Sequence, residues 1–306
     1  SAAELGKAIS SADASVVTIN CLANNFGEDG LSTLLAAIKG TSVRSLCGLT
    51  EGQTVADFSD QNLGPIDCKI MAAEFAFQGF IASLTSLCCG SNPIKDEGMA
   101  VLLDAVKGIG LIEFDISKTS IGPPTAKKLA EVLSDATPFT ASIASLKLDS
   151  NGIFGELYPN GDVKEADKFV TEVQPLLDAL KTSSISSLSL RGTGMGVKGV
   201  AAVADAMSAM RSLVEVNMAR AIIGESGPAL VEAIKKSPSL ESITIGKGLR
   251  LSLKETYASD VFDASNQNIE SGGVALIAWW LTTSVSSSIA RISVLSNPIG
   301  VEGATA

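Results

Sequence analysis

Three glycines in the second half of the chain have the spacing of a dinucleotide-binding fingerprint. Gly194, Gly196 and Gly199 follow the apolar segment SISSLSL and precede a predicted helix. In dinucleotide-binding proteins this pattern lets a pyrophosphate approach the backbone at a helix N-terminus, and a later carboxylate, for which Glu215 is suitably placed, binds the ribose. Gly196 and Gly199, however, belong to a glycine pair that recurs along the chain, so nucleotide binding is the weaker interpretation.

Other residue types that could support catalysis are missing or are placed for another role. The chain contains no histidine, which excludes Ser-His-Asp and Cys-His systems, HExxH zinc sites and histidine-based proton transfer. The segment 246–248, Gly-Lys-Gly, lacks the spacing and the hydroxyl residue of a phosphate-binding loop. Several carboxylates fall at predicted turns or helix starts, where they meet the helix dipole favourably: Asp96, Glu97, Glu225 and Glu302. We therefore predict that the protein is not an enzyme and uses no cofactor and no metal.

The cysteines favour neither a metal site nor a disulfide framework. Their number is odd, their spacing is irregular, and no two of them form a CxxC pair: Cys21, Cys47, Cys68, Cys88 and Cys89. Such thiols are typical of reduced side chains that pack as small apolar groups. They indicate an intracellular protein, in the cytoplasm or inside an organelle.

The charge balance narrows the classes of partner. Among 306 residues, 33 Asp and Glu outnumber 23 Lys and Arg, which gives a net charge of −10. A nucleic-acid binder needs a surface rich in Lys and Arg, so we expect no nucleic acid as partner, and the same sign disfavours anionic lipid. No apolar run reaches the roughly 18 residues that a membrane span requires. We also expect no small-molecule substrate.

Internal repetition organises the chain. The phrase SNPIKDEGMA at 91–100 returns as SNPIGVEGAT at 296–305, and SDQNL at 59–63 returns as SNQNI at 265–269. Both follow one template: apolar, two free, apolar, one free, apolar, two free, polar, one free, apolar. The residues at the polar position, which is alanine in one unit, give about nine units: Asn24, Gln61, Asn92, Thr119, Asn151, Thr193, Ala221, Gln267 and Asn297.

The template predicts a short strand, a turn and a helix in each unit. Apolar strand residues alternate inward, and an inward amide or hydroxyl can bond backbone groups that the turn leaves unpaired. A glycine pair then usually opens an Ala/Leu-rich helix: Gly27/Gly30, Gly196/Gly199, Gly224/Gly227 and Gly300/Gly303. Because no unit can bury its apolar stripe alone, the units must stack. We predict an α/β fold in a single domain over residues 1–306, with an incomplete C-terminal repeat.

The motif LxxLxLxxNxIGxxG, with a full helix in each unit, resembles the ribonuclease-inhibitor-like class of leucine-rich repeats. That class also includes activators of the Ran GTPase. The resemblance extends from about Val16 to Gly303. It implies a solenoid, or horseshoe, with short parallel strands on the concave face and helices on the convex face. It implies little about function, because this class binds many unrelated partners.

Three insertions interrupt the period, near residues 47–57, 154–168 and 246–260. Insertions in repeat proteins emerge as loops, often around the binding face. Both tyrosines, Tyr158 and Tyr257, lie in these insertions, and tyrosine is enriched at interface hot spots. Trp279 and Trp280 are neighbours in a predicted helix and point about 100° apart. We therefore expect one of them to be buried and the other, assigned here as Trp280, to contact a partner.

The residues between the inward apolar positions should point to the concave surface. They are small, polar and mildly acidic, and those expected to contact a partner are Asn20, Asp57, Asp115, Lys147, Asp149, Arg191, Asn217 and Asp263. Because no catalytic set accompanies them, we predict a non-catalytic protein–protein interaction module, a scaffold or an accessory subunit. Its partner would be another protein or a multi-subunit complex.

The resemblance also implies an alternative function, a GTPase-activating protein of the Ran-activator type. Such proteins need no histidine, because they position groups of their partner with polar residues of the concave side. The insertions shift the repeats of this chain, so the sequence does not show which residues would correspond.

Overall fold

The computed structural model describes residues 2–10, 16–24, 26–76 and 80–300, along which strands and helices alternate. The strands are β1 (Val55–Asp57), β2 (Ser86–Cys88), β3 (Glu113–Asp115), β4 (Ser145–Lys147), β5 (Glu156–Leu157), β6 (Val163–Glu165), β7 (Ser187–Ser189), β8 (Glu215–Asn217), β9 (Ser242–Ile245), β10 (Leu249–Ser252), β11 (Val261–Asp263) and β12 (Arg291–Ser293). The α-helices are α1 (Ala2–Ser10), α2 (Gly27–Ile38), α3 (Pro65–Ala76), α4 (Lys95–Val106), α5 (Pro123–Ser134), α6 (Pro138–Ser142), α7 (Val170–Leu180), α8 (Val197–Ala209), α9 (Gly227–Lys236) and α10 (Ser271–Leu281).

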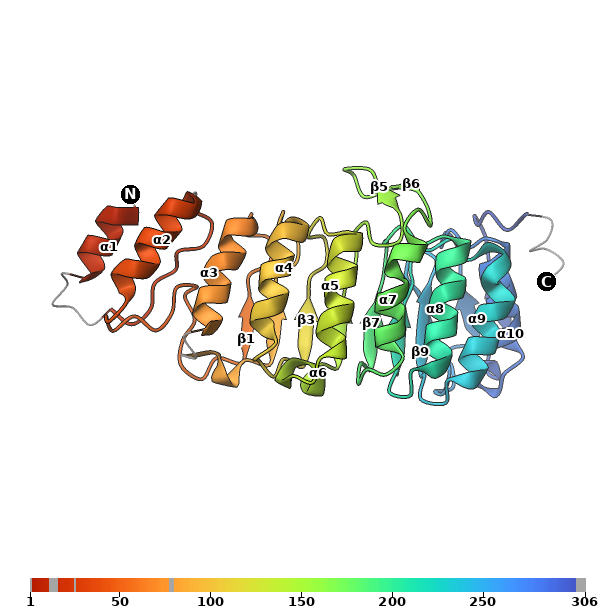
Figure 1. The fold of residues 1–306 in the computed structure, drawn as a ribbon. Helices are drawn as coiled ribbons and strands as arrows, with labels where there is room; N and C mark the ends of the chain where they lie inside the picture. The colour runs from red at the N-terminus through yellow and green to blue at the C-terminus, as the bar shows by residue number, and fades with distance from the viewer. Residues whose placement is uncertain (1, 11–15, 25, 77–79, 301–306) are drawn as a thin grey trace.

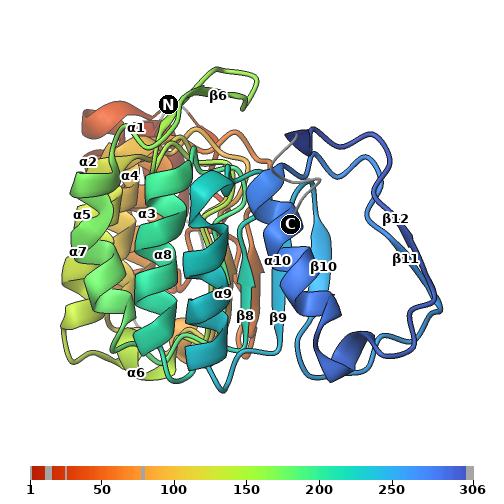
Figure 2. The same ribbon diagram turned by 90° about the vertical axis from the view of Figure 1, so that its right-hand side faces the viewer.

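The helices lie side by side in a row, with α1 and α10 at opposite ends (Figure 1). Viewed along the row, helices such as α7, α8 and α9 form one layer, and the strands β8 and β9 belong to a second layer beside them (Figure 2). The apolar side chains of the helices are buried in the core; in α4 they include Met99, Leu102 and Val106, all fully buried. Among the described residues, one cluster of buried side chains extends from Cys21 to Val285.

The main sheet has eight strands among the described residues, in the order β1-β2-β3-β4-β7-β8-β9-β10. All neighbours pair in parallel except β9 and β10, which are antiparallel. The central residues of successive strands stand opposite one another and are buried: Ala56, Leu87, Phe114, Leu146, Leu188, Val216 and Ile243. The predicted α/β fold with a parallel sheet and helices is therefore confirmed, and its strand–turn–helix unit is that of a leucine-rich-repeat-like fold.

Buried asparagines tie each turn to the turn before it. The amide of Asn151 donates to the carbonyl groups of Ile116 and Leu148 at 2.8 and 3.1 Å, and its oxygen accepts from the N–H groups of Thr119 and Ile121 at 2.9 and 3.3 Å. Asn92 and Asn297 make the corresponding bonds to the preceding unit. The predicted role of the polar position is thus confirmed at these asparagines, where it extends across two units. The amide oxygen of Gln267, at another polar position, is buried without a hydrogen-bond partner among the described residues.

The residue before the polar position is in the left-handed conformation at all nine predicted turns, with φ from 54° to 66°: Ala23, Asp60, Ser91, Lys118, Ser150, Gly192, Arg220, Asn266 and Ser296. Most L-residues avoid this conformation. Here it lets the N–H of that residue donate to a carbonyl group of the next unit, for example from Lys118 to Asp149 at 2.7 Å. The inter-unit ladder therefore continues beyond the strands and around the turns.

Two strand-like segments were not counted among the nine predicted units. β9 carries the apolar frame Leu240, Ile243 and Ile245 and pairs with β8, although no polar residue follows at the usual distance. Residues 45 and 47 form isolated bridges with residues 18 and 20. The template missed both segments because it relied on the polar residue of the turn.

The insertions near 47–57 and 246–260 interrupt the sheet at corresponding places. Among the described residues, β1 forms the end of the first insertion and pairs only with β2, whereas β11 follows the second insertion and pairs only with β12. Inside the second insertion, β10 folds back on β9. In Figure 2, β11 and β12 accordingly lie apart from the main sheet. Both breaks precede the units that contain the similar phrases SDQNL and SNQNI.

The insertion at 154–168 forms the hairpin β5–β6, which rises above the row of helices (Figure 1). Its base is fixed to the turn of the next unit, because the N–H groups of Phe154 and Asp167 donate to the carbonyl groups of Thr193 and Gly194, both at 3.0 Å. Phe154 is fully buried beneath it. The hairpin is thus part of the folded array rather than a free loop.

Two predictions concern residues outside the described part of the chain. The second glycine of the Gly300/Gly303 pair and the carboxylate of Glu302 lie there, as does the end of the incomplete C-terminal repeat. Within the described residues, none of the helices combines the length and the apolar character needed to cross a membrane.

We predict that the substitution Asn151→Ala lowers the free energy of unfolding by about 2–4 kcal/mol, because it leaves buried N–H and carbonyl groups of two turns without partners. The change is measured by urea denaturation. The control is Asn24→Ala, whose exposed side chain bonds only to the carbonyl groups of Cys21 and Leu22, and it should cost less than about 1 kcal/mol. Equal losses in the two variants would contradict the inter-unit role of Asn151.

Candidate functional site: a groove beneath the inserted hairpin

Most residues predicted to contact a partner lie on the strand face, the side of the sheet opposite the helices. Five of them use Oδ1 to accept a hydrogen bond from the backbone N–H two residues ahead, at 2.8–3.0 Å: Asn20, Asp57, Asp115, Asn217 and Asp263. Hydrogen bonds from Ser59 and Ser265 lower the pKa of Asp57 and Asp263, respectively. The hydrogen bond within the turn is therefore sufficient to explain why a polar residue occupies this position, and no binding partner is needed to explain it.

Lys147 and Asp149, also predicted to contact a partner, are held by neighbouring groups. Nζ of Lys147 lies 2.5 Å from Oε1 of Glu113. Oδ1 of Asp149 accepts hydrogen bonds from the Ser189 hydroxyl at 2.6 Å and from the backbone N–H of Arg191 at 2.9 Å. Burial raises the pKa of Asp149. Both side chains thus contribute to contacts between neighbouring strands.

The assignment of Trp280 as a partner-contacting residue is wrong. Its side chain is 0% exposed, its Nε1–H donates to the carbonyl oxygen of Ser252 at 2.6 Å, and its ring packs against Phe262 with centroids 4.9 Å apart. Tyr257 is also half-buried, and its ring meets those of Phe262 and Trp280 at 5.6 and 5.8 Å. These aromatics fill the space where the insertion separates β10 from β11, so Tyr257 is a packing residue rather than a free loop aromatic.

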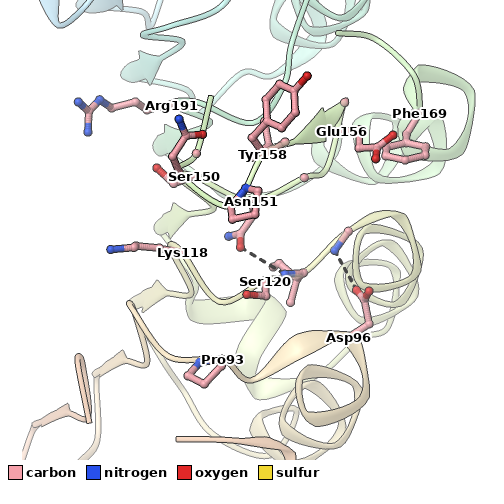
Figure 3. Close-up of a pocket in the computed structure, with 18 of the residues that line it drawn as sticks. Pro93, Asp96, Lys118, Ser120, Ser150, Asn151, Glu156, Tyr158, Phe169 and Arg191 are labelled. Carbon is pink, nitrogen blue, oxygen red and sulfur yellow. Dashed lines mark hydrogen bonds between the residues drawn. The ribbon is translucent and has the colours of Figure 1, made fainter. Parts of the chain in front are cut away.

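Tyr158 and Arg191, in contrast, lie together at a groove of about 830 Å³. The hairpin β5–β6 forms one wall, and the turns after β2, β3, β4, β7 and β8 form the rest. Figure 3 shows Lys118 and Arg191 projecting to the same side of the groove, with Tyr158 extending from the hairpin. The Tyr158 side chain is 51% exposed. Of the predicted site residues, these two are brought to the groove.

The carboxylates of the groove are engaged in the fold. Oδ1 of Asp96 accepts hydrogen bonds from the N–H groups of Gly122 and Thr125, at 2.9 and 3.1 Å, and from the Thr125 hydroxyl at 2.6 Å, which caps α5. Glu156 pairs with Lys164, at 2.5 Å, and with Lys168. These two ammonium groups lower the pKa of Glu156 to about 2. Neither carboxylate is therefore placed for proton transfer at neutral pH.

The cations of the groove are less engaged than its carboxylates, although the positive charge of Arg191 acts on Asp149 and partly offsets the rise in its pKa that burial causes. Lys118, Arg191 and Arg220 line the groove, and none of them forms an ion pair with a residue that the structure describes. Beyond Arg220 the groove continues into a hollow of about 330 Å³ that contains Lys247 and the exposed Asp162. We call Lys118, Arg191, Arg220 and Lys247 the cationic row.

Sequence reasoning missed three members of the cationic row, Lys118, Arg220 and Lys247. Lys118 and Arg220 occupy the left-handed position before the polar turn residue, where other units carry Gly, Ala, Asp, Asn or Ser. A long cationic side chain there has no role in the turn itself. A cationic residue where the repeat usually has a small or polar one was therefore the signal in the sequence that could have identified Lys118 and Arg220 as site residues.

The glycine fingerprint at 194–199 is occupied by the chain's own carboxylate. Oδ1 of Asp167 accepts hydrogen bonds from the N–H groups of Gly196 and Gly199 at 2.7 and 2.9 Å, and Oδ2 accepts one from Lys198 at 2.7 Å. A Cβ on Gly194 would lie 2.7 Å from the backbone of Gly155, which explains the remaining glycine. Asp167 thus takes the place at the α8 N-terminus that a pyrophosphate would need.

The cysteine thiols lie in surroundings that suppress their reactivity. All five cysteines are free, and burial raises the pKa of each thiol, to about 12 for Cys68. A thiol must lose its proton to act as a nucleophile. Within the described residues, no group of three or more Cys, Asp or Glu side chains is arranged to hold a metal ion.

Comparison with known proteins adds a likeness at the level of structure. A leucine-rich repeat-containing protein from Legionella pneumophila, LegL7, is 18% identical to this chain, with a TM-score of 0.36; the alignment covers 95% of this chain and 87% of that one. No family model and no curated protein matches the sequence. The evidence for a leucine-rich-repeat-like fold therefore lies in the strands, the turns and the buried asparagines of this chain itself.

We predict that Asp167→Asn lowers the free energy of unfolding by about 1–2 kcal/mol, because the amide cannot accept all three hydrogen bonds and removes a negative charge from the α8 N-terminus. Asparagine tolerates the left-handed backbone of this residue, whose φ is 59°. Thermal denaturation measures the change. The exposed Glu255, changed to Gln, controls for net charge, and a loss as large as that of Asp167→Asn would refute a specific capping role.

Stability near Asp149 should depend on pH. Burial raises the pKa of Asp149 above its ordinary value of 3.8, so the folded state binds the proton of this carboxyl group more tightly than the unfolded state does. The stability contributed by the group is present below 3.8 and is lost as the pH rises through the raised pKa. Relative to Asp149→Asn, which does not titrate, the parent chain should become less stable in urea denaturation as the pH rises above 3.8. A difference that stays constant with pH would contradict the raised pKa.

Proposed function

We propose that this chain is a non-catalytic protein–protein interaction module that serves as a scaffold or accessory subunit of a larger complex. The finer architecture belongs to the same proposal: a leucine-rich-repeat solenoid, of horseshoe type, with about nine units that carry the polar turn position. The free thiols support a location in the cytoplasm or inside an organelle. No membrane, nucleic acid or small-molecule substrate is part of the proposal.

The proposal rests on a contrast between two sets of side chains around the groove, those that are bound within the chain and those that are not. The buried asparagines and the groove carboxylates Asp96 and Glu156 are bound within the chain. Lys118, Arg191, Arg220 and the exposed ring of Tyr158 face the groove without such partners among the described residues. Arginine and tyrosine are the residue types enriched at protein interfaces. The surface is thus suited to recognition rather than to bond breaking.

The experiment is cross-linking through lysines in native extract of the source cells, followed by mass spectrometry and repeated with Tyr158→Ala. Lys164, on the hairpin, and Lys118, at the groove, are exposed reporters. We expect links from this region to one defined partner and at least a several-fold loss of capture with Tyr158→Ala, since truncating an interface tyrosine typically costs more than about 1 kcal/mol. Tyr158→Ala should fold normally, because this side chain is half exposed.

Each other outcome has a definite meaning. A chain that stays monomeric and recovers no partner under these conditions would overturn the proposed function. If the captured partner is a Ran-type GTPase, a GTP-hydrolysis assay decides between the module and the activator alternative. Stimulation of hydrolysis by the purified chain would replace the non-catalytic proposal with the alternative.

A further inference from the structure

The cationic row follows the turns at one edge of the main sheet. Lys118 follows β3, Arg191 follows β7, Arg220 follows β8 and Lys247 follows β9. With neighbouring strands about 4.8 Å apart, the four steps from β3 to β9 place the ends of the row roughly 20 Å apart. An extended peptide advances about 3.3 Å per residue, so about six residues would span the row. The groove is open along this line, from the hollow at Lys118 to the hollow at Lys247.

The cationic row is positively charged, whereas the whole chain has a net negative charge. The protein has a net charge of −10, yet the cations of the row make no ion pair with described residues, while Asp96 and Glu156 beside them are already hydrogen-bonded or paired. Among the described residues, the ammonium group of Lys247 donates a hydrogen bond to the neutral Oδ1 of Asn266, at 3.0 Å. The exposed Asp162 opposes binding of an anion in the second hollow, so the attraction is concentrated between Lys118 and Arg220.

On the basis of the proposed function, we infer that the groove binds a short extended acidic segment of the partner protein. Its Asp or Glu side chains meet Lys118, Arg191 and Arg220, and an adjacent part of the segment packs on the exposed ring of Tyr158. Arginine is suited to this task because its planar guanidinium can bind a carboxylate through two hydrogen bonds.

A nucleic acid is the competing polyanion, and the observations favour a peptide. Nucleic-acid binding draws on a broad field of Lys and Arg, whereas here a few cations lie on a chain with ten more acids than bases.

The test uses fluorescence anisotropy of a labelled hexaglutamate peptide with the full chain, beside a hexaglutamine peptide and a hexathymidylate oligonucleotide. The variant Lys118→Gln/Arg191→Gln/Arg220→Gln should weaken hexaglutamate binding about tenfold or more. The control Arg44→Gln/Lys127→Gln/Arg211→Gln removes the same number of each cation from exposed positions outside the groove and should change binding by less than about twofold. Hexaglutamine should not bind measurably.

Several results would overturn the inference. The first is that hexaglutamate does not bind. The second is an equal loss of hexaglutamate affinity in both triple variants, which would indicate an effect of net charge alone. The third is tighter binding of the oligonucleotide than of hexaglutamate through the same cations. Circular dichroism verifies folding, and Arg191→Gln alone, at a residue outside the left-handed region, replaces the triple variant if that fails to fold. A partner whose cross-links avoid the groove would refute this inference and leave the proposed interaction function standing.

Discussion

The hydrogen-bonding needs of the turns govern this structure. Each strand is only a few residues long, so much of the backbone between strand and helix lies outside the sheet and must find other partners as it becomes buried. Asn92, Asn151 and Asn297 meet this need for two units at once, and the left-handed residues before Asn92 and Asn151 continue the ladder into the next unit. Where threonine replaces asparagine, as at Thr119 and Thr193, the side chain bonds only within its own turn.

This arrangement also shapes the surface available for recognition. Because the asparagines, the strand-end aspartates and the helix-capping carboxylates are hydrogen-bonded within the chain, their positions are explained by the turns and the helix ends. The left-handed residues lie at the same edge, and two of them, Lys118 and Arg220, line the groove. The hairpin β5–β6 adds Tyr158 beside them. Stability and recognition therefore use neighbouring but different side chains of the same turns.

The periodicity of the sequence was sufficient to predict the strand–turn–helix unit, because apolar spacing and the polar turn residue are local signals. β9 was missed because its turn lacks the polar residue, and Trp280 was misassigned because adjacency in a helix does not show which ring meets the space left by the insertion. Of the residues that line the groove, only Tyr158 and Arg191 were predicted from the sequence to contact a partner. Its remaining cations come together through the order of the strands, which places Lys118 near residues far away in the sequence.

The most direct test of this account is native-state hydrogen exchange of the N–H groups that Asn151 binds, those of Thr119 and Ile121. If the inter-unit bonds hold the array together, both amides exchange only through global unfolding, with protection like that of the central sheet residues Phe114 and Leu146. If they exchange instead through local opening, as quickly as the exposed hairpin-tip amides of residues 160–162, the asparagine bonds are not the constraint on which the structure depends.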